Sequence, residues 1–277
     1  MNQFQELIYK GTNLLSKCGI KKARYETMIL AKKSLNKSML ELLINSEIDI
    51  TKNQKKKILQ RICKRINGKP ISKICGRKEF FSNEFIVNCD VLDPRPESEL
   101  IVEVIKKINK KFLNKKLRIL DLGTGSGCLL ISIFLELKST KIFGLGIDIS
   151  EKALKIASKN LKKFNLHKKL FLKKSNWFSN VKGKFDIIVS NPPYIESSNI
   201  IKLSREVRNF DPLIALDGGS DGLEGFKKIA LVAKEHLRGG GMVCLELGKG
   251  QINRVDKIFG KAGFNAILKE KDLQGIS

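Results

Sequence analysis

The chain has 277 residues, of which 42% are hydrophobic, and a formal net charge of +25. This length allows one large domain or a medium and a small one, with enough apolar residues for a globular core. No run of about 18 uncharged apolar residues is present, so we expect no membrane span. The first ten residues (MNQFQELIYK) lack the apolar stretch of a signal peptide, and we therefore expect a cytoplasmic protein.

Cysteine and histidine usage gives no indication of a metal site. The six cysteines form no Cys-x-x-Cys pair, and several lie in apolar runs, so we expect reduced and buried thiols. His167 and His236 are the only histidines, and we expect no metal.

The positive charge has two possible explanations. Lysine, isoleucine and asparagine are all abundant, as an AT-rich coding sequence would produce without selection for function. However, residues 1–75 carry 17 Lys and Arg against 5 Asp and Glu. A basic N-terminal segment could contact RNA, an acidic protein or only solvent.

The first 67 residues predict short helices. Apolar residues recur at helical spacing up to Gly19, and residues 23–35 and 38–44 are further candidates. Thr51 is expected to cap a helix that ends near Ile66. The polar side of this last helix is expected to form a basic outer face of Lys55, Lys56, Arg61, Lys64 and Arg65.

Residues 79–92 predict a two-stranded hairpin, and from about residue 97 helices alternate with strands. Helices are expected at 97–111, 128–137, 151–164 and 223–237, and strands at 117–122, 141–147, 169–172, 184–190 and 242–247. This alternation predicts an α/β fold with a mostly parallel sheet and helices on both of its faces. We expect a helical domain (1–75), a β-hairpin linker (76–92) and an α/β domain (93–277).

Special residues follow four successive strands of the α/β domain. Glycines after the first strand, in Asp121-Leu-Gly-Thr-Gly-Ser-Gly127, would let a ligand approach the backbone and the start of the next helix. The next strand ends at Asp148, which could accept both hydroxyls of an adenosine ribose or could only cap a helix. Trp177, after the third strand, could lie on an adenine ring or only anchor the core.

The fourth strand ends in Asn191-Pro-Pro-Tyr194. Two prolines cannot continue a ladder of hydrogen bonds, so a stiff corner presents the Asn191 amide, a carbonyl oxygen and the ring of Tyr194. A rigid turn without function is the alternative. Open α/β sheets bind ligands at the carboxyl ends of their strands, which favours a ligand site here.

These motifs resemble those of S-adenosylmethionine-dependent methyltransferases with a Rossmann-like sheet, and more closely those of the peptide chain release factor glutamine methyltransferases. The resemblance covers nearly the whole chain. It rests on Arg77-Lys-Glu-Phe-Phe81, Asp93-Pro-Arg-Pro-Glu-Ser-Glu99, DLGTGSG, SNPPYI, Ala215-Leu-Asp-Gly-Gly219 and Leu245-Glu-Leu-Gly-Lys-Gly-Gln251.

The resemblance implies N5-methylation of the glutamine in the Gly-Gly-Gln motif of class I release factors, which modulates translation termination. It implies S-adenosyl-L-methionine as the cofactor and release factors as protein partners, with nucleic acid not required. The residues implied to bind the cofactor are Gly123, Thr124, Gly125, Ser126, Gly127, Asp148, Trp177 and Asn191. Those implied to hold the glutamine are Asn191, Pro192, Pro193 and Tyr194, with Asn191, Pro192 and Tyr194 in catalysis.

Three departures from the family pattern stand out. Position 176 is Asn where the family usually has Asp, and Asp93 stands where an apolar residue is usual. The chain also ends at 272–277 (DLQGIS), where the family continues into a last antiparallel strand.

A carboxamide nitrogen is a poor nucleophile, so the site would have to act by position. The Asn191 side-chain oxygen and the Pro192 carbonyl would hold the NH₂ group while Tyr194 packs on the amide plane. Such alignment can lower a barrier by roughly 7–11 kcal/mol.

Three other functions remain open. The same corner would suit an exocyclic amine of DNA or RNA, although few residues follow Tyr194 to form a target-recognition domain. A glutamine of a ribosomal protein is a second alternative, and a non-catalytic RNA-binding module is a third.

Overall fold

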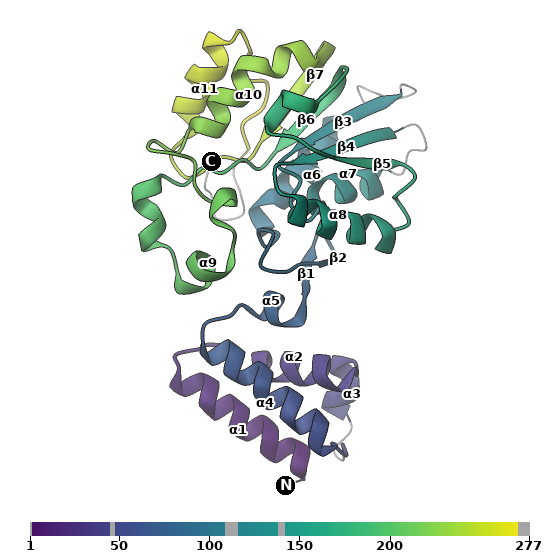
Figure 1. Ribbon diagram of the computed structural model, residues 1–277, viewed down its shortest axis with the longest axis vertical. Helices are drawn as coiled ribbons and strands as arrows, with labels where there is room; N and C mark the ends of the chain where they lie inside the picture. Colours follow the sequence, from purple (N-terminus) through teal and green to yellow (C-terminus); the bar gives the residue numbers. More distant parts are fainter. Residues whose placement is uncertain (1, 45–47, 109–115, 138–141, 271–277) are drawn as a thin grey trace. The chain divides into compact units, whose positions relative to one another are not determined.

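The computed structural model describes residues 2–44, 48–108, 116–137 and 142–270. These residues divide into two compact units. The helical unit comprises residues 1–76 together with 205–210, and the α/β unit comprises residues 77–204 and 211–277. Figure 1 labels the elements of both.

The helical unit is built from α-helices around a small apolar core. Its helices are α1 (Gln3–Lys17), α2 (Ala23–Leu35), α3 (Met39–Ile44), α4 (Lys52–Ile66), α5 (Ile71–Cys75) and α9 (Arg205–Phe210). Thr51 caps α4 as expected, because its hydroxyl accepts from Gln54 N while the Gln54 side chain accepts from Thr51 N. Leu15, Leu30 and Ile62 are fully buried between α1, α2 and α4.

The prediction that Arg65 belongs to an exposed basic face of α4 is wrong. Arg65 is only 7% exposed, and its guanidinium pairs with Glu26 of α2 and Glu206 of α9. An arginine on the edge of an amphipathic stripe can turn inward when two carboxylates meet its donors. The exposed basic residues of α4 are Lys52, Lys55, Lys56, Lys57 and Lys64.

The α/β unit begins with a short hairpin of β1 (Arg77–Phe80) and β2 (Asn83–Ile86). Phe81 and Ser82 form its turn with φ values of 47° and 57°. The hairpin ends at Ile86, before the expected position 92. The Asn160 side chain of the later helix α8 pairs with both the N–H and the carbonyl of Ile86, which holds the hairpin on the α/β unit.

Five parallel strands form the sheet of the α/β unit in the order β5-β4-β3-β6-β7. The strands are β3 (Leu117–Leu122), β4 (Ile142–Asp148), β5 (Leu170–Lys174), β6 (Phe185–Ser190) and β7 (Leu237–Leu245). The order confirms the expected parallel α/β fold. The chain builds outward from β3 to β5 and then crosses to β6, so the strand order reverses between β3 and β6. Ligands bind at such a reversal.

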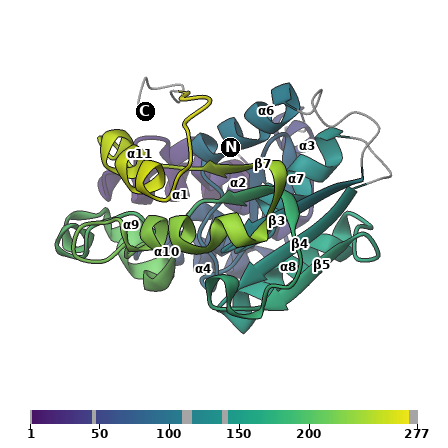
Figure 2. The ribbon, with the colours of Figure 1, turned by 90° about the horizontal axis from the view of Figure 1, so that it is seen from above.

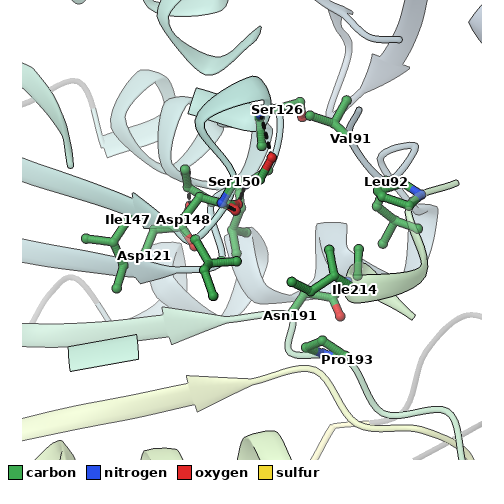
Figure 3. A pocket seen from close by; sticks show the side chains of 18 of the residues that line it. Val91, Leu92, Asp121, Ser126, Ile147, Asp148, Ser150, Asn191, Pro193 and Ile214 are labelled. Carbon is green, nitrogen blue, oxygen red and sulfur yellow. Dashed lines mark hydrogen bonds between the residues drawn. The ribbon is translucent and has the colours of Figure 1, made fainter. Parts of the chain in front are cut away.

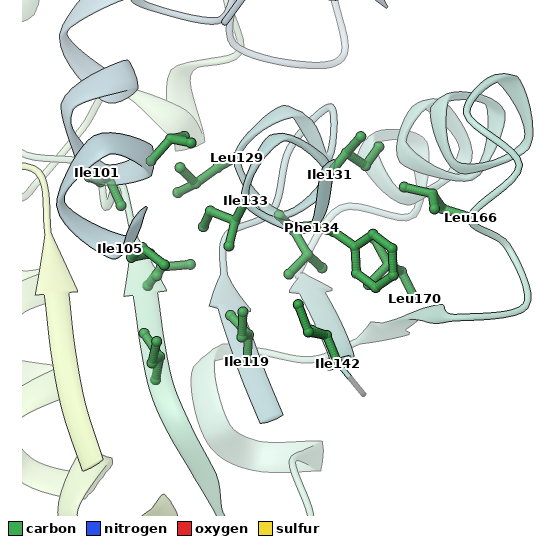
Figure 4. Close-up of a cluster of buried hydrophobic side chains, with 14 of the residues drawn as sticks. Ile101, Ile105, Ile119, Leu129, Ile131, Ile133, Phe134, Ile142, Leu166 and Leu170 are labelled. Atoms are coloured by element: carbon green, nitrogen blue, oxygen red, sulfur yellow. The ribbon is translucent and has the colours of Figure 1, made fainter. Parts of the chain in front are cut away.

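Helices cover both faces of this sheet. One face packs on α6 (Glu99–Ile108), α7 (Cys128–Leu137) and α8 (Glu151–Lys163), and Figure 4 shows Ile101, Ile105 and Ile133 facing Ile119 of β3. The other face packs on α10 (Glu224–Val232) and α11 (Ile252–Lys261), which lie side by side in Figure 1 and Figure 2.

The ends of several elements differ from expectation. The helix expected at 223–237 ends at Val232 and continues as a 3₁₀ turn at Ala233–His236, while β7 begins at Leu237, five residues early. Short 3₁₀ helices occur at Pro96–Ser98, Trp177–Asn180, Ser197–Lys202 and Leu213–Ala215. Three expectations concern residues outside the described ones. They are the end of the helix at 109–111, the start of the strand at 141 and the departure at 272–277.

Among the described helices none is both long and apolar enough to cross a membrane. Cys18, Cys63 and Cys89 are exposed thiols, so the expectation of burial is wrong for these three.

Candidate active site

A pocket of about 370 Å³ lies in the α/β unit where the carboxyl ends of β3, β4 and β6 meet. Figure 3 shows Asp121, Ile147 and Asp148 at the strand ends, and Asn191, Pro193 and Ile214 along another side. Residues 90–95 complete its wall together with Pro212, Ile214, Ala215 and Asp217.

The glycine loop after β3 forms one wall of the pocket. Gly123 and Gly125 have φ values of 74° and 55°, which favour glycine and leave no side chain between the backbone and the pocket. Thr124 donates its hydroxyl to the Asp121 carboxylate at 2.6 Å and its N–H to the Ile147 carbonyl at 2.8 Å. These bonds fix the loop on β3 and β4.

Four residues of this loop line the pocket, and one does not. Gly123, Thr124, Gly125 and Ser126 are lining residues. A Cβ atom at Gly127 would lie 3.4 Å from Ala157 and from Ile131, so this glycine faces α8 and the body of α7.

Asp148 ends β4 and faces the pocket. Its Oδ2 accepts from Gly125 N and its Oδ1 from Ser150 N, each at 2.9 Å. Ser150, not Asp148, caps α8 by accepting from Ala153 N. Each carboxylate oxygen has a second lone pair, so Asp148 retains acceptor sites for a pair of hydroxyl groups.

Asp121 is a buried carboxylate at the base of the pocket that the sequence did not single out. It is 1% exposed. Burial raises its pKa to about 7, the Asp148 charge adds to the rise, and the bond from Thr124 opposes it. Burial also raises the pKa of Asp148. Two such carboxylates favour a ligand that carries positive charge.

Trp177 lines the pocket from the loop after β5. Its backbone has a φ of 50°, and its ring lies so close to Gly225 that a Cβ there would be 3.1 Å from it. The neighbouring Asn176 and the buried Asp93, both departures from the family pattern, also line the pocket.

The Asn191–Tyr194 corner is divided between two hollows. Asn191 and Pro193 line the pocket, whereas Pro192 does not. Tyr194 lines a second hollow of about 490 Å³, together with Glu246 at the end of β7. The Tyr194 hydroxyl donates to Glu246 Oε1 at 3.2 Å, and burial and the Glu246 charge raise the pKa of Tyr194.

Ser98 and Glu246 complete the corner, and sequence reasoning gave them no role. The Asn191 amide donates from Nδ2 to Ser98 Oγ at 2.9 Å, and Ser98 in turn donates to Glu246. Both residues stand inside motifs that resemble the family, 93–99 and 245–251, which was the only signal available for them.

The site residues fit S-adenosylmethionine. Glycine backbone and the Asp148 carboxylate suit a ribose, Trp177 supplies an aromatic face, and Asp121 suits a cationic group. Among the described residues no cluster could hold a metal ion.

Two family models match the chain. Residues 90–207 match the methyltransferase small domain, and residues 6–76 match the PrmC N-terminal domain. The catalytic domain of hMettl16, crystallised with an RNA hairpin, has a similar fold, with a TM-score of 0.54 and 17% identity over 74% of each chain.

Two groups of curated relatives resemble the chain over most of its length. A bifunctional methyltransferase of Rickettsia prowazekii is 36% identical over 98% of this chain, which spans only 55% of that relative. The release factor glutamine methyltransferases of Agrobacterium fabrum and Thermodesulfovibrio yellowstonii are 37% and 40% identical, over 86% and 82% of this chain and 82% and 81% of their own lengths. With both domain matches in place, the chain belongs to the family of the release factor glutamine methyltransferases.

Proposed function

We propose that this protein transfers a methyl group from S-adenosylmethionine to the side-chain amide nitrogen (N5) of the glutamine in the Gly-Gly-Gln motif of a class I release factor. The observation that carries the proposal is Asn191, whose amide lies at the rim of a pocket suited to the cofactor. Release factors act in translation, so we place the activity in the cytoplasm.

The cofactor supplies an electrophilic methyl group. Asp148 would accept from its ribose hydroxyls, Trp177 would pack on its adenine, and the glycine loop would let it lie against the backbone. Gly127 contributes indirectly by letting α7 and α8 pack closely. Asp121 and Asp148 attract its positive charge.

Asn191 Oδ1 and the Pro192 carbonyl hold the two hydrogens of the substrate NH₂ group, and Tyr194 with Pro193 confines the amide plane. The N–CH₃ bond forms as the S–CH₃ bond breaks, and S-adenosylhomocysteine leaves. The methylated nitrogen is acidic and releases its proton to water, so no strong base is needed. This alignment can lower the activation free energy by roughly 7–11 kcal/mol.

The test is methyl transfer from labelled cofactor to a release factor, with mass spectrometry of the digested product. We expect the label on the Gly-Gly-Gln glutamine alone, and none on a release factor whose glutamine is replaced by glutamate, because that residue has no NH₂ group. Labelling of DNA, RNA or a ribosomal protein at a comparable rate would refute the proposal in favour of one of those substrates.

A further inference from the structure

A chain of hydrogen bonds runs from the pocket into the protein behind Asn191. Glu246 is 9% exposed and receives the Ser98 hydroxyl on one oxygen and the Tyr194 hydroxyl on the other. Asn191 donates from Nδ2 to Ser98 Oγ at 2.9 Å and also interacts with Glu246. Ser98 is 5% exposed, so solvent does not compete for these bonds.

We propose that Glu246, acting through Ser98, fixes which end of the Asn191 side-chain amide faces the substrate. A carboxylate can only accept hydrogen bonds. Since Ser98 gives its single proton to Glu246, its oxygen can only accept from Asn191, and the partner must be the NH₂ end. Oδ1 of Asn191 is thereby left for the pocket. Glu246 and Ser98 are positioning residues, and their role rests on the proposed function.

The orientation matters because a carboxamide has nearly the same shape when turned by 180°. Turned around, Asn191 would present two N–H donors to a substrate group that itself only donates. A productive complex requires an acceptor at that place. An amide with no fixed partner would occupy both orientations, and only one of them would be active.

The sheet holds Glu246 beside the corner. Ser190 of β6 pairs with Leu245 of β7, and Glu246 N donates to the Ser190 carbonyl at 3.1 Å. Ser98 ends the 3₁₀ turn Pro96–Ser98, which opens with a proline, just before α6. Neighbouring strands and a short rigid turn thus bring together residues far apart in the sequence.

Glu246→Gln tests the proposal, because glutamine keeps the size but supplies one oxygen instead of two for three donors. Its NH₂ group donates to Ser98 or Asn191, which favours the reversed amide. We expect kcat to fall about 10- to 100-fold, while KM for the release factor and the affinity for S-adenosylhomocysteine change less than about threefold. Ser98→Ala should behave alike, and Ser98→Thr, which keeps the hydroxyl, should restore kcat.

Asp186→Asn is the matched control. Asp186 is a partly buried carboxylate on β6, the strand that precedes Asn191, and it accepts from Arg118 N and pairs with Arg238. Its replacement should lower the melting temperature without changing kcat. If Glu246 and Ser98 were only structural, Glu246→Gln and Ser98→Ala would give this same pattern, which would overturn the proposal.

A second measurement needs no release factor. In ¹⁵N NMR spectra, the Asn191 side-chain amide signal, assigned by its loss in Asn191→Asp, should exchange slowly with solvent in the wild type. It should exchange faster in Glu246→Gln and Ser98→Ala. Equal exchange in all three would overturn the inference whatever the substrate, whereas failure of methyl transfer by the wild type would refute only the proposed function.

Discussion

Recognition of a carboxamide at Asn191 depends on the residues directly after it. Pro192 and Pro193 lack the N–H groups that would continue the β6 ladder, so the chain leaves the sheet at the pocket. Because these prolines have no backbone N–H, neither residue places a hydrogen-bond donor of its own beside its carbonyl oxygen. An amide side chain in such a setting offers an acceptor in a fixed direction.

Replacement of Asn191 should therefore affect the reaction rate more than binding. We expect Asn191→Ala to lower kcat by about 100-fold or more, equivalent to about 3 kcal/mol, because one of the two acceptors for the substrate NH₂ is lost. Asn191→Asp keeps an acceptor and should retain part of the activity. Initial rates of methyl transfer to a release factor measure both, and an Asn191→Ala rate close to that of the wild type would contradict the assignment.

Asp121 should make stability depend on pH in a direction opposite to most acidic residues. Its pKa is about 7 in the folded protein against an ordinary value of 3.8. The folded state therefore binds more protons than the unfolded state between these values. The stability that Asp121 contributes is fully present below about pH 4 and is lost as pH rises through about 7.

Asp121→Asn removes this titration. We expect its melting temperature to decrease less than that of the wild type between about pH 5 and pH 8. The difference between the two decreases reports the ionisation of Asp121. Thermal unfolding of both proteins across this range is the measurement. Parallel curves would show that Asp121 is charged throughout.

How far the site could be predicted depends on sequence distance. Asp148 ends β4, Asn191 directly follows β6 and Trp177 comes shortly after β5, so a parallel sheet brings all three to one edge. Ser98 meets Asn191 across 93 residues, and no local pattern signals that meeting. Gly127 has the right spacing for ligand binding, yet it lies directly before α7 and faces α8.

At the scale of elements, long periodic segments were predictable and single turns were not. The helices α1, α4 and α8 each present a regular apolar stripe that the sequence makes visible. By contrast, α5 and α9 have five and six residues, too few for a stripe. The start of β7 was not predicted, because it contains Arg238-Gly-Gly-Gly241 and glycine is unfavourable in strands.

Arg65 should be the main anchor of α9 in the helical unit. It is buried, and it pairs with Glu26, whose side chain is 17% exposed, and with Glu206, whose side chain is 43% exposed. Arg65→Ala leaves Glu26 without this partner in a mostly buried position, and we expect a loss of about 3 kcal/mol in unfolding free energy.

Glu206→Gln removes only the exposed half of the arrangement and should cost less than about 1 kcal/mol. Denaturant unfolding of both variants, followed by circular dichroism, gives the comparison. Equal losses would mean that burial of Arg65 does not determine the strength of this contact.

At the scale of the molecule, the chain passes between the units more than once. It leaves the α/β unit after Ser204, contributes α9 to the helical unit, and re-enters at Asp211. Asp211 accepts from Arg95, and the residues that follow, Pro212, Ile214 and Ala215, line the pocket. The expected boundary near residue 75 did not include this excursion, because α9 carries no compositional change.

We propose that the helical unit docks the release factor, and that the exposed lysines of α4 contribute to this docking. Lys55, Lys56 and Lys64 stand on the solvent side of α4, which has no acidic residue. Such a surface attracts an acidic partner over a distance and mainly accelerates association. Its contribution should weaken as salt rises, because mobile ions screen exposed charges.

Reversing the three lysines to glutamate should raise KM for the release factor about tenfold at low salt, with kcat and cofactor affinity unchanged. The matched control reverses Lys155, Lys159 and Lys162, which are also exposed and lie on α8 of the α/β unit. It makes the same change in net charge. A docking surface on α4 predicts a salt-dependent rise in KM for the first variant and a much smaller one for the control. Equal effects in the two variants would mean that the positive charge acts only as a property of the whole molecule, as expected if the lysines reflect coding composition alone.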